Sequence, residues 1–443
     1  MISLKLGSKK KVQTAWAMYD WANSVYSLVI TSTIFPVYFN SVTKSVTEND
    51  VVSFFGFQIV NTVLYSYSIS FSFLVVALIS PLLSGMADSG GKKLLFMKLF
   101  AYLGSLACIG LFFFDGSNLE YGIMCSILAS IGYAGSIVFY NAFLPEIADE
   151  SEYDFLSARG FALGYIGSVI LLVANLLMIE FPGYFGLSDG SQAARWSFLI
   201  TGIWWAAFSQ IPFKYLPDNP YKKKVSKSLL LKGYKEIRSV FREVRSQKVM
   251  NRFLAAFLFY SMGVQTVMYL AATFGDKELG LPGDKLILTI LIIQLVAIIG
   301  SYLFAYISKV HGNRLSLLIM VFIWIVICVG AYFVYHEYQF YALAFVVGMV
   351  MGGIQSQSRS TYSKLIPTET TDHASYFSFY DVTEKIAIVI GTFSYGLIEQ
   401  ITGNMRNSSL FLGLFFVVGI GFLILVKIPK PQVELAKVPL AHD

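Results

Sequence analysis

Long apolar stretches recur along this chain, in two sets of six that flank a Lys/Arg-rich segment at residues 218–249. Each stretch is roughly 20 to 25 residues long, which as a helix matches the ~30 Å hydrocarbon core of a bilayer. The stretches therefore predict transmembrane helices. Two similar sets of six helices are typical of a transporter.

The composition independently indicates a membrane protein. Hydrophobic residues make up 56% of the 443 residues and charged residues only 14%, and a water-soluble fold could not bury that much apolar surface. The net charge of +6 comes from cations in the short segments between the stretches, which is the pattern of cytoplasmic loops and not of a nucleic-acid binding surface. We expect a surrounding lipid bilayer and no nucleic-acid partner.

The division of the chain follows from this pattern. We expect a first six-helix bundle at 1–217, a basic connector at 218–249, a second six-helix bundle at 250–428 and a tail at 429–443. Cations concentrate in the loops of one side, so the connector and both termini are predicted to be cytoplasmic. Apolar residues at helical spacing among the cations of the connector predict either an amphipathic helix on the inner leaflet or a solvated linker that only fixes the topology.

Two loops at corresponding positions indicate an internal duplication. Residues 85–93 read GMADSGGKK and residues 306–314 read YISKVHGNR, and their glycines at Gly91 and Gly312 are 221 positions apart. Pro145 and Pro367, each at the end of a fourth span, are 222 positions apart. One duplicated unit of six helices explains both offsets.

The first of these loops resembles the signature of the major facilitator superfamily, in which a glycine, an aspartate and a basic pair close the turn between helices two and three. Glycine permits a tight turn, and the aspartate can cap a helix N-terminus or pair with a cation in one conformation only. The match is partial, because Ser89 stands where an arginine is common and Lys309 replaces the acid in the second copy. The residues expected to form this gating loop and its copy are Gly85, Asp88, Gly91, Lys92, Lys93, Lys309, Gly312 and Arg314.

A narrower resemblance extends over nearly the whole chain. The segments YDWANSVY at 19–26, SARGFALGYIG at 157–167, YSMGVQT at 260–266 and GIQSQSR at 353–359 are similar to those of the vacuolar-effluxer-like branch of that superfamily. The resemblance implies a transporter, and the eukaryotic members are associated with amino-acid efflux from the vacuole. For this chain we expect the bacterial cytoplasmic membrane. One departure is Met262, which stands where the branch usually has an acid, so this chain has either lost ion coupling or uses another group.

Ionisable groups inside the spans mark candidate positions along a solute pathway, because they are costly in lipid and usually face water or a partner. Asp20 lies in the first span, with Asn23 on the same helical face and Tyr26 alongside. Its carboxyl group is expected either to carry a proton or to hold a structural bond. Arg359 lies at a similar depth in the tenth span, so the two are predicted to join the halves on the cytoplasmic side when the pathway faces outward. The alternative is that Arg359 reaches lipid phosphates.

The eleventh span carries three charges, Asp381, Glu384 and Lys385. Asp381 and Lys385 are one helical turn apart and can neutralise each other, which leaves Glu384 unmatched. Lys385 is expected either to bind a carboxylate of the solute or only to stabilise packing. Further polar groups that are expected either to contact the solute or to bond one helix to another are Tyr260, Gln265, Gln355 and Tyr380.

The remaining signals exclude several classes of function. The three cysteines lie inside apolar stretches and the four histidines lie at span ends, in loops or in the tail, so we expect no disulfide framework, no metal site and no cofactor. The sequence contains no phosphate-binding loop of the kind that ATP-driven pumps use, and no segment outside the spans is long enough for an enzyme domain. An acidic run from Glu146 to Asp154 is expected to be a solvated loop or, alternatively, to contact Lys364 or the connector.

These observations favour an all-α membrane protein with the major facilitator fold, in which twelve transmembrane helices form two six-helix bundles. The expected function is secondary active transport of a small polar solute, an amino acid first of all, by alternating access. Outward movement and proton coupling are part of this expectation. The alternatives are a lipid or amphiphile transporter of the same fold and a membrane sensor that binds a solute without moving it. We expect a monomer without enzymatic activity.

Overall fold

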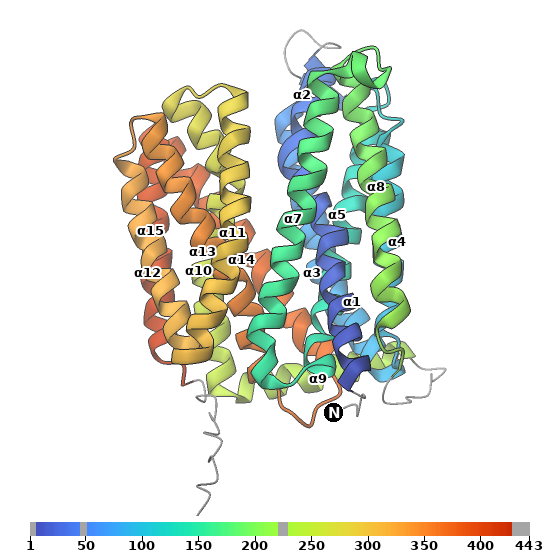
Figure 1. The fold of residues 1–443 in the computed structure, drawn as a ribbon, viewed down its shortest axis with the longest axis vertical. Helices are drawn as coiled ribbons and strands as arrows, with labels where there is room; N and C mark the ends of the chain where they lie inside the picture. The colour runs from blue at the N-terminus through green and yellow to red at the C-terminus, as the bar shows by residue number, and fades with distance from the viewer. Residues whose placement is uncertain (1–5, 45–50, 220–228, 428–443) are drawn as a thin grey trace, which may run out of the picture.

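The computed structural model describes residues 6–44, 51–219 and 229–427, and nearly all of them are helical (Figure 1). The first half contains α1 (Leu6–Val25), a π-helix (Tyr26–Ile34), α2 (Phe35–Lys44), β1 (Val51–Phe54), β2 (Phe57–Val60), α3 (Asn61–Gly90), α4 (Lys93–Leu111), α5 (Leu119–Asn141), α6 (Leu144–Ile147), α7 (Tyr153–Glu180) and α8 (Gly190–Tyr215). The second half contains α9 (Leu229–Ser246), α10 (Lys248–Leu279), α11 (Gly283–His311), α12 (Asn313–Tyr332), α13 (Glu337–Leu365), α14 (His373–Thr402) and α15 (Met405–Ile424). Two bundles stand side by side, α1 to α8 in one and α10 to α15 in the other (Figure 1).

Ten helices in the described part of the chain are long and apolar enough to cross a membrane. Two more, α8 with 26 residues and α14 with 30, have the length but not the apolarity. Tryptophan, serine and glutamine lower the hydropathy of α8, and α14 carries three charges near its middle. Both pack inside the bundles, and the count of twelve crossings stays a prediction.

Most helix contacts lie within one bundle, and only a few helices contact the other bundle. In the first bundle α4 packs on α5 and α8, and α1 packs on α7 and α8; in the second, α11 packs on α13, and α15 packs on α10 and α12. The bundles meet where α7 contacts α11 and α13 and where α3 contacts α14. Tryptophans fill the interiors, since Trp16, Trp205 and Trp324 are fully buried.

The connector forms the helix α9, which runs across one end of the bundles (Figure 1). We call this end the connector end and the opposite end the far end. The bundles lie close together at the connector end and diverge toward the far end (Figure 1). A Cβ atom added at Gly85 of α3 would lie 2.3 Å from the backbone oxygen of Gly233, so α9 crosses α3 at backbone contact.

The two faces of α9 differ, because Val240 and Val244 are buried while Arg238 and Arg242 are exposed. This contact with α3 shows a packed helix and not a solvated linker. The predicted tail at 429–443 lies outside the described residues.

A short hairpin departs from the all-helical expectation. Strands β1 and β2 pair antiparallel, with Val51 opposite Val60 and Phe54 opposite Phe57. The two residues between them, Phe55 and Gly56, have φ values of 48° and 84°, which is the left-handed backbone that two-residue hairpin turns require.

The first transmembrane passage is not a regular helix. Between α1 and α2, Tyr26–Ile34 forms a nine-residue π-helix that continues directly into α2. A π-helical turn widens the backbone ladder and shifts the side chains that follow it. Nothing in the local sequence predicted this segment.

Candidate transport pathway

Asp20 and Arg359 form an ion pair that joins the two bundles. The Oδ2 atom of Asp20 on α1 lies 3.3 Å from both terminal nitrogens of Arg359 on α13. Only 7% of Asp20 and 3% of Arg359 is exposed. The Tyr140 hydroxyl donates a third hydrogen bond, of 2.7 Å, to the same carboxylate oxygen. The pairing rules out the alternative in which Arg359 reaches lipid phosphates.

Every donor nitrogen of Arg359 finds an acceptor in the first bundle. Besides Asp20, the guanidinium donates to the Ser157 hydroxyl at 2.9 Å, to the Ser157 carbonyl at 2.9 Å and to the Asn141 side-chain oxygen at 3.2 Å. Its plane lies over the rings of Phe161 at 4.3 Å and Trp16 at 4.8 Å. We call Asp20, Tyr140, Asn141, Ser157 and Arg359 the Arg359 cluster. Such saturation is what a buried charge needs to be stable in a membrane protein.

Small residues on α7 make room for this cluster. A Cβ atom at Gly160 would lie 2.4 Å from Oδ2 of Asp20, and one at Gly164 would lie 2.5 Å from the Ser24 hydroxyl. These two glycines of α7 therefore allow α1 to approach α7 closely.

Asp154 is the centre of a second buried group between the bundles. Its carboxylate, at the start of α7, accepts hydrogen bonds from Asn313 at 2.7 Å, Lys364 at 2.7 Å and Ser308 at 3.1 Å. Ser360 also donates to it. We call Asp154, Ser308, Asn313, Ser360 and Lys364 the Asp154 cluster. The interpretation of this acidic run as a solvated loop is therefore wrong for Asp154, and the alternative, contact with Lys364, is what the structure shows.

The predicted gating loop also contacts the second bundle. Asp88 accepts hydrogen bonds from the backbone N–H groups of Ser375 at 2.7 Å and Ala374 at 3.3 Å, so it caps the start of α14. Lys93 pairs with Oε1 of the buried Glu146. The same oxygen atom lies 3.0 Å from Nδ1 of His373. The chain turns at Gly91, whose φ of 64° favours glycine. The loop also includes Lys92 and Gly85, and Gly85 contacts the backbone of α9.

The second copy of the loop does not repeat these contacts. Lys309 lies 5.6 Å from the ring of Phe155 in the first bundle, Arg314 donates to the carbonyl of Ile424 within the second bundle, and Gly312 ends α11 with a φ of 89°. The missing acid at Lys309 explains the difference, since no carboxylate is available there to cap a helix.

The three charges of α14 form a compact group that we call the α14 triad. The ammonium group of Lys385 lies 3.0 Å from Asp381 and 3.6 Å from Glu384, and 5.4 Å from the ring centre of Phe73 on α3. Glu384 accepts a 2.9 Å hydrogen bond from Gln265 of α10. The Lys385 and Asp381 side chains are 8% and 3% exposed, whereas the Glu384 side chain is 23% exposed.

Tyrosines that the sequence analysis did not select surround this triad. Tyr269 is 37% exposed, yet it interacts electrostatically with Lys385, Glu384 and Tyr26. Tyr133 of α5 interacts with Lys385 and Tyr269 and packs its ring 5.2 Å from that of Tyr26. Tyr269 on α10 and Tyr133 on α5 thus lie near the triad from opposite bundles. The chain has 27 tyrosines, and no local pattern separates these from the rest.

Gln355 is the one neutral candidate that bridges the bundles among the described contacts, through a 2.6 Å hydrogen bond from the Tyr165 hydroxyl of α7. The other candidates bond within one bundle. Tyr260 lies 2.7 Å from the Ser358 hydroxyl, Tyr380 stacks on Phe257 at 4.2 Å, and Tyr26 lies 2.7 Å from the Ser130 hydroxyl. Asn23 is buried, 1% exposed, and contacts Ser24.

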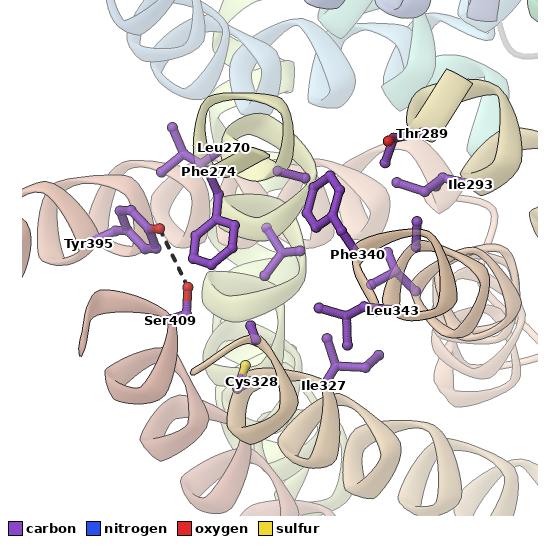
Figure 2. A pocket seen from close by; sticks show the side chains of 15 residues that line it. Leu270, Phe274, Thr289, Ile293, Ile327, Cys328, Phe340, Leu343, Tyr395 and Ser409 are labelled. Atoms are coloured by element: carbon purple, nitrogen blue, oxygen red, sulfur yellow. Dashed lines mark hydrogen bonds between the residues drawn. The ribbon is translucent and has the colours of Figure 1, made fainter. Parts of the chain in front are cut away.

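An apolar pocket lies inside the second bundle, away from these polar groups. Figure 2 shows its lining, which includes Leu270, Phe274, Ile327 and Phe340, and none of its 15 residues is charged. Within the lining, the Tyr395 hydroxyl lies 3.4 Å from the Ser409 hydroxyl. In the described part of the chain, no group of three or more His, Cys, Asp and Glu side chains is placed to hold a metal ion.

Comparisons with known proteins agree on one family and one fold. The family model described as "Vacuole effluxer Atg22 like" matches residues 8–436. The chain is 30% identical to the uncharacterized MFS-type transporter YxiO of Bacillus subtilis, over 94% of this chain and 95% of that protein. It is 24% identical to Autophagy-related protein 22 of Yarrowia lipolytica, over 87% of this chain and 79% of that protein.

Solved structures show the same architecture. The crystal structure of the E. coli fucose:proton symporter FucP superposes with a TM-score of 0.69 at 12% identity, and the alignment covers 95% of this chain and 99% of that one. At this identity the likeness establishes the fold alone. It confirms the major facilitator fold that the two sets of apolar stretches predicted.

Proposed function

Since this chain belongs to the vacuole effluxer Atg22-like family of the major facilitator superfamily, and is a secondary transporter and not an enzyme, we propose that it exports a small polar solute, an amino acid first of all. We further propose that the movement is coupled to protons. The family membership supports secondary transport as such.

The observation that carries the proposal is the set of buried polar clusters at the connector end. The Arg359 and Asp154 clusters and the Asp88 cap join the bundles there, while the bundles diverge at the far end (Figure 1). Alternating access requires contacts of this kind, which form in one state and separate in the other. Because cations concentrate at the connector end, we place it in the cytoplasm, so that this state faces outward.

A polar solute fits the interface better than an amphiphile does. Glu384, Tyr269 and Gln355 lie between the bundles and offer charge and hydrogen bonds. A lipid or amphiphile would need an apolar path between the bundles, but the apolar pocket lies within the second bundle (Figure 2). This alternative therefore has less support.

Proton coupling has a better candidate in Glu384 than in Asp20. Asp20 is held by Arg359 and Tyr140, which suits a structural bond. Glu384 is more exposed and is held by an amide and a more distant ammonium. Met262, the position that lacks the usual acid, is buried on α10, one turn before the Gln265 that contacts Glu384.

Counterflow in proteoliposomes tests the proposal and separates transport from sensing. Vesicles loaded with one unlabelled amino acid from a panel of common ones should accumulate the same labelled amino acid, and an imposed pH gradient should change the rate. A sensor would bind the solute without counterflow. Accumulation of fatty acids or lipids in place of any amino acid would favour the amphiphile alternative.

The protein is an integral multi-pass membrane protein. We propose the bacterial cytoplasmic membrane, with both termini cytoplasmic, and a monomeric state, since the pathway residues come from the two bundles of one chain. Proteolysis of a tag at each terminus in oriented vesicles checks the orientation.

A further inference from the structure

The charged groups buried between the bundles do not balance. Asp20 and Arg359 neutralise each other, but the α14 triad has two carboxylates and one ammonium group. With all three groups ionised, the triad has a net charge of −1. A net charge inside a membrane protein is costly, so this position favours a bound cation.

The exposed member of the triad is the one able to exchange that cation. Lys385 lies closer to Asp381, at 3.0 Å, than to Glu384, at 3.6 Å. The Asp381 side chain is 3% exposed and the Glu384 side chain 23%. Lys385 is itself buried between both carboxylates, so it offers little to a carboxylate of the solute. Of the two roles expected for Lys385 from the sequence, this arrangement favours the packing role.

The groups that face Glu384 from the neighbouring helices supply no second positive charge in the described residues. From α10 these are Gln265, Tyr260 and Tyr269, and from α14 itself Tyr380 lies nearby. Beside Lys385 lie Phe73 of α3 and Tyr133 of α5. Helix α9 contacts α14 through the rings of Phe241 and Phe379. On α15 the cation is Arg406, which is already paired with Glu278.

We infer that the ammonium group of the solute and the coupling proton share one carboxylate, that of Glu384. This inference rests on the proposed function. When the solute arrives, its ammonium group pairs with Glu384 and the proton of the carboxyl group leaves to water. The rings of Tyr269 and Tyr133 near the triad would favour an ammonium group as well, because aromatic rings attract cations. The solute class is thus an ammonium-bearing molecule, in which a carboxylate is not required.

Binding of three related compounds to the purified protein tests this. The first is the amino acid with the largest effect on thermal unfolding in a panel of common amino acids, the second its carboxyl amide, and the third its N-acetyl derivative. We expect the first two to bind and the third not to bind. Calorimetry in buffers of different ionisation enthalpy should detect proton release on binding, and affinity should fall as the solution becomes more acidic.

The Glu384→Gln variant should bind the amino acid ~10- to 100-fold more weakly, as expected for losing a hydrogen bond to a charged group, and should release no proton. Glu399→Gln is the matched control, because Glu399 lies on the same helix but pairs with Lys277 near its end; its binding should match the wild type.

Binding of the N-acetyl compound but not of the amide would overturn the inference. It would mean that a cationic side chain of the protein recognises the carboxylate of the solute. Equal affinity and equal proton release in Glu384→Gln would also overturn it, while counterflow by the wild type would leave the proposed function intact. If no amino acid binds and none shows counterflow, the proposed function itself is wrong.

Discussion

Arg359 concentrates the contacts between the bundles on one side chain. It makes five hydrogen bonds to the first bundle, although Asp20 is 339 positions away in the chain. Such a group is stable only while every partner is in place, because an uncompensated buried charge is far costlier than a paired one. The cluster therefore distinguishes sharply between a closed and an open connector end.

Substitution of either partner should weaken the closed state. In Asp20→Asn the guanidinium loses its counter-charge, which costs ~3–5 kcal/mol for a buried pair, so we expect a lower unfolding temperature in detergent and slower counterflow. Arg359→Gln should slow counterflow as well, and the double variant should recover part of the lost stability.

Arg159→Gln is the matched control for charge, because Arg159 is an exposed cation on α7, and it should behave as the wild type. Unchanged counterflow and unchanged unfolding in both Asp20→Asn and Arg359→Gln would remove the assigned role.

Gly160 allows a test that changes no charge. In Gly160→Ala the new methyl group would lie 2.4 Å from the Asp20 carboxylate and 3.0 Å from the Arg359 guanidinium, so the ion pair must shift. We expect counterflow to slow as it does in Asp20→Asn. Gly396→Ala, where no atom lies within 4 Å of the new methyl group, should remain active; equal effects in both variants would point to helix flexibility instead.

At the scale of helices, α9 packs on α3, the helix that leads into the gating loop at residues 85–93. It crosses α3 at Gly85 and Gly233 and reaches α14 through the contact of Phe241 with Phe379. Since α3 and α14 meet at the Asp88 cap, α9 covers the joint between the bundles. Any opening of the connector end must change the packing of α9.

Gly233→Ala should loosen this helix. Its methyl group would lie 2.9 Å from the backbone nitrogen of Met86, too close for α9 to keep its position. We expect trypsin to cleave faster after the exposed Arg238 and Arg242, measured by the rate at which the chain separates into two halves. Gly183→Ala, which meets no atom within 4 Å, serves as control, and equal cleavage rates in the two variants would show that the crossing tolerates a side chain.

At the scale of the whole molecule, the two ends should differ in access from water. Cysteine labelling with a membrane-impermeant maleimide measures this, since the native cysteines Cys108, Cys125 and Cys328 are buried. We expect Tyr269→Cys to react from the far end, because Tyr269 is 37% exposed. Ser157→Cys, inside the Arg359 cluster and fully buried, should react slowly until the connector end opens; the reverse order would contradict the closed state described above.

The sequence predicted the two bundles because hydrophobic length and the duplicated loops are properties of the chain itself. It also predicted the Asp20–Arg359 pair, since both residues lie at a similar depth near the end of the spans that carries the flanking cations. It offered the contact of Asp154 with Lys364 only as an alternative, and it did not predict the other members of the Asp154 cluster or the tyrosines around the α14 triad. Those contacts depend on how helices of opposite bundles are rotated against one another, and rotation is set by packing that a single sequence does not display. The roles of the individual pathway residues stay predictions.

The π-helix at Tyr26–Ile34 divides the first passage into two parts that need not move together. Below it, α1 holds Asp20 in the Arg359 cluster; above it, α2 is fastened within its own bundle by the Tyr38 hydroxyl, 2.6 Å from the Phe114 carbonyl. Wide helical turns are where long helices bend. We therefore expect the passage to bend at this segment, so that α2 can change its tilt while α1 keeps Asp20 in place.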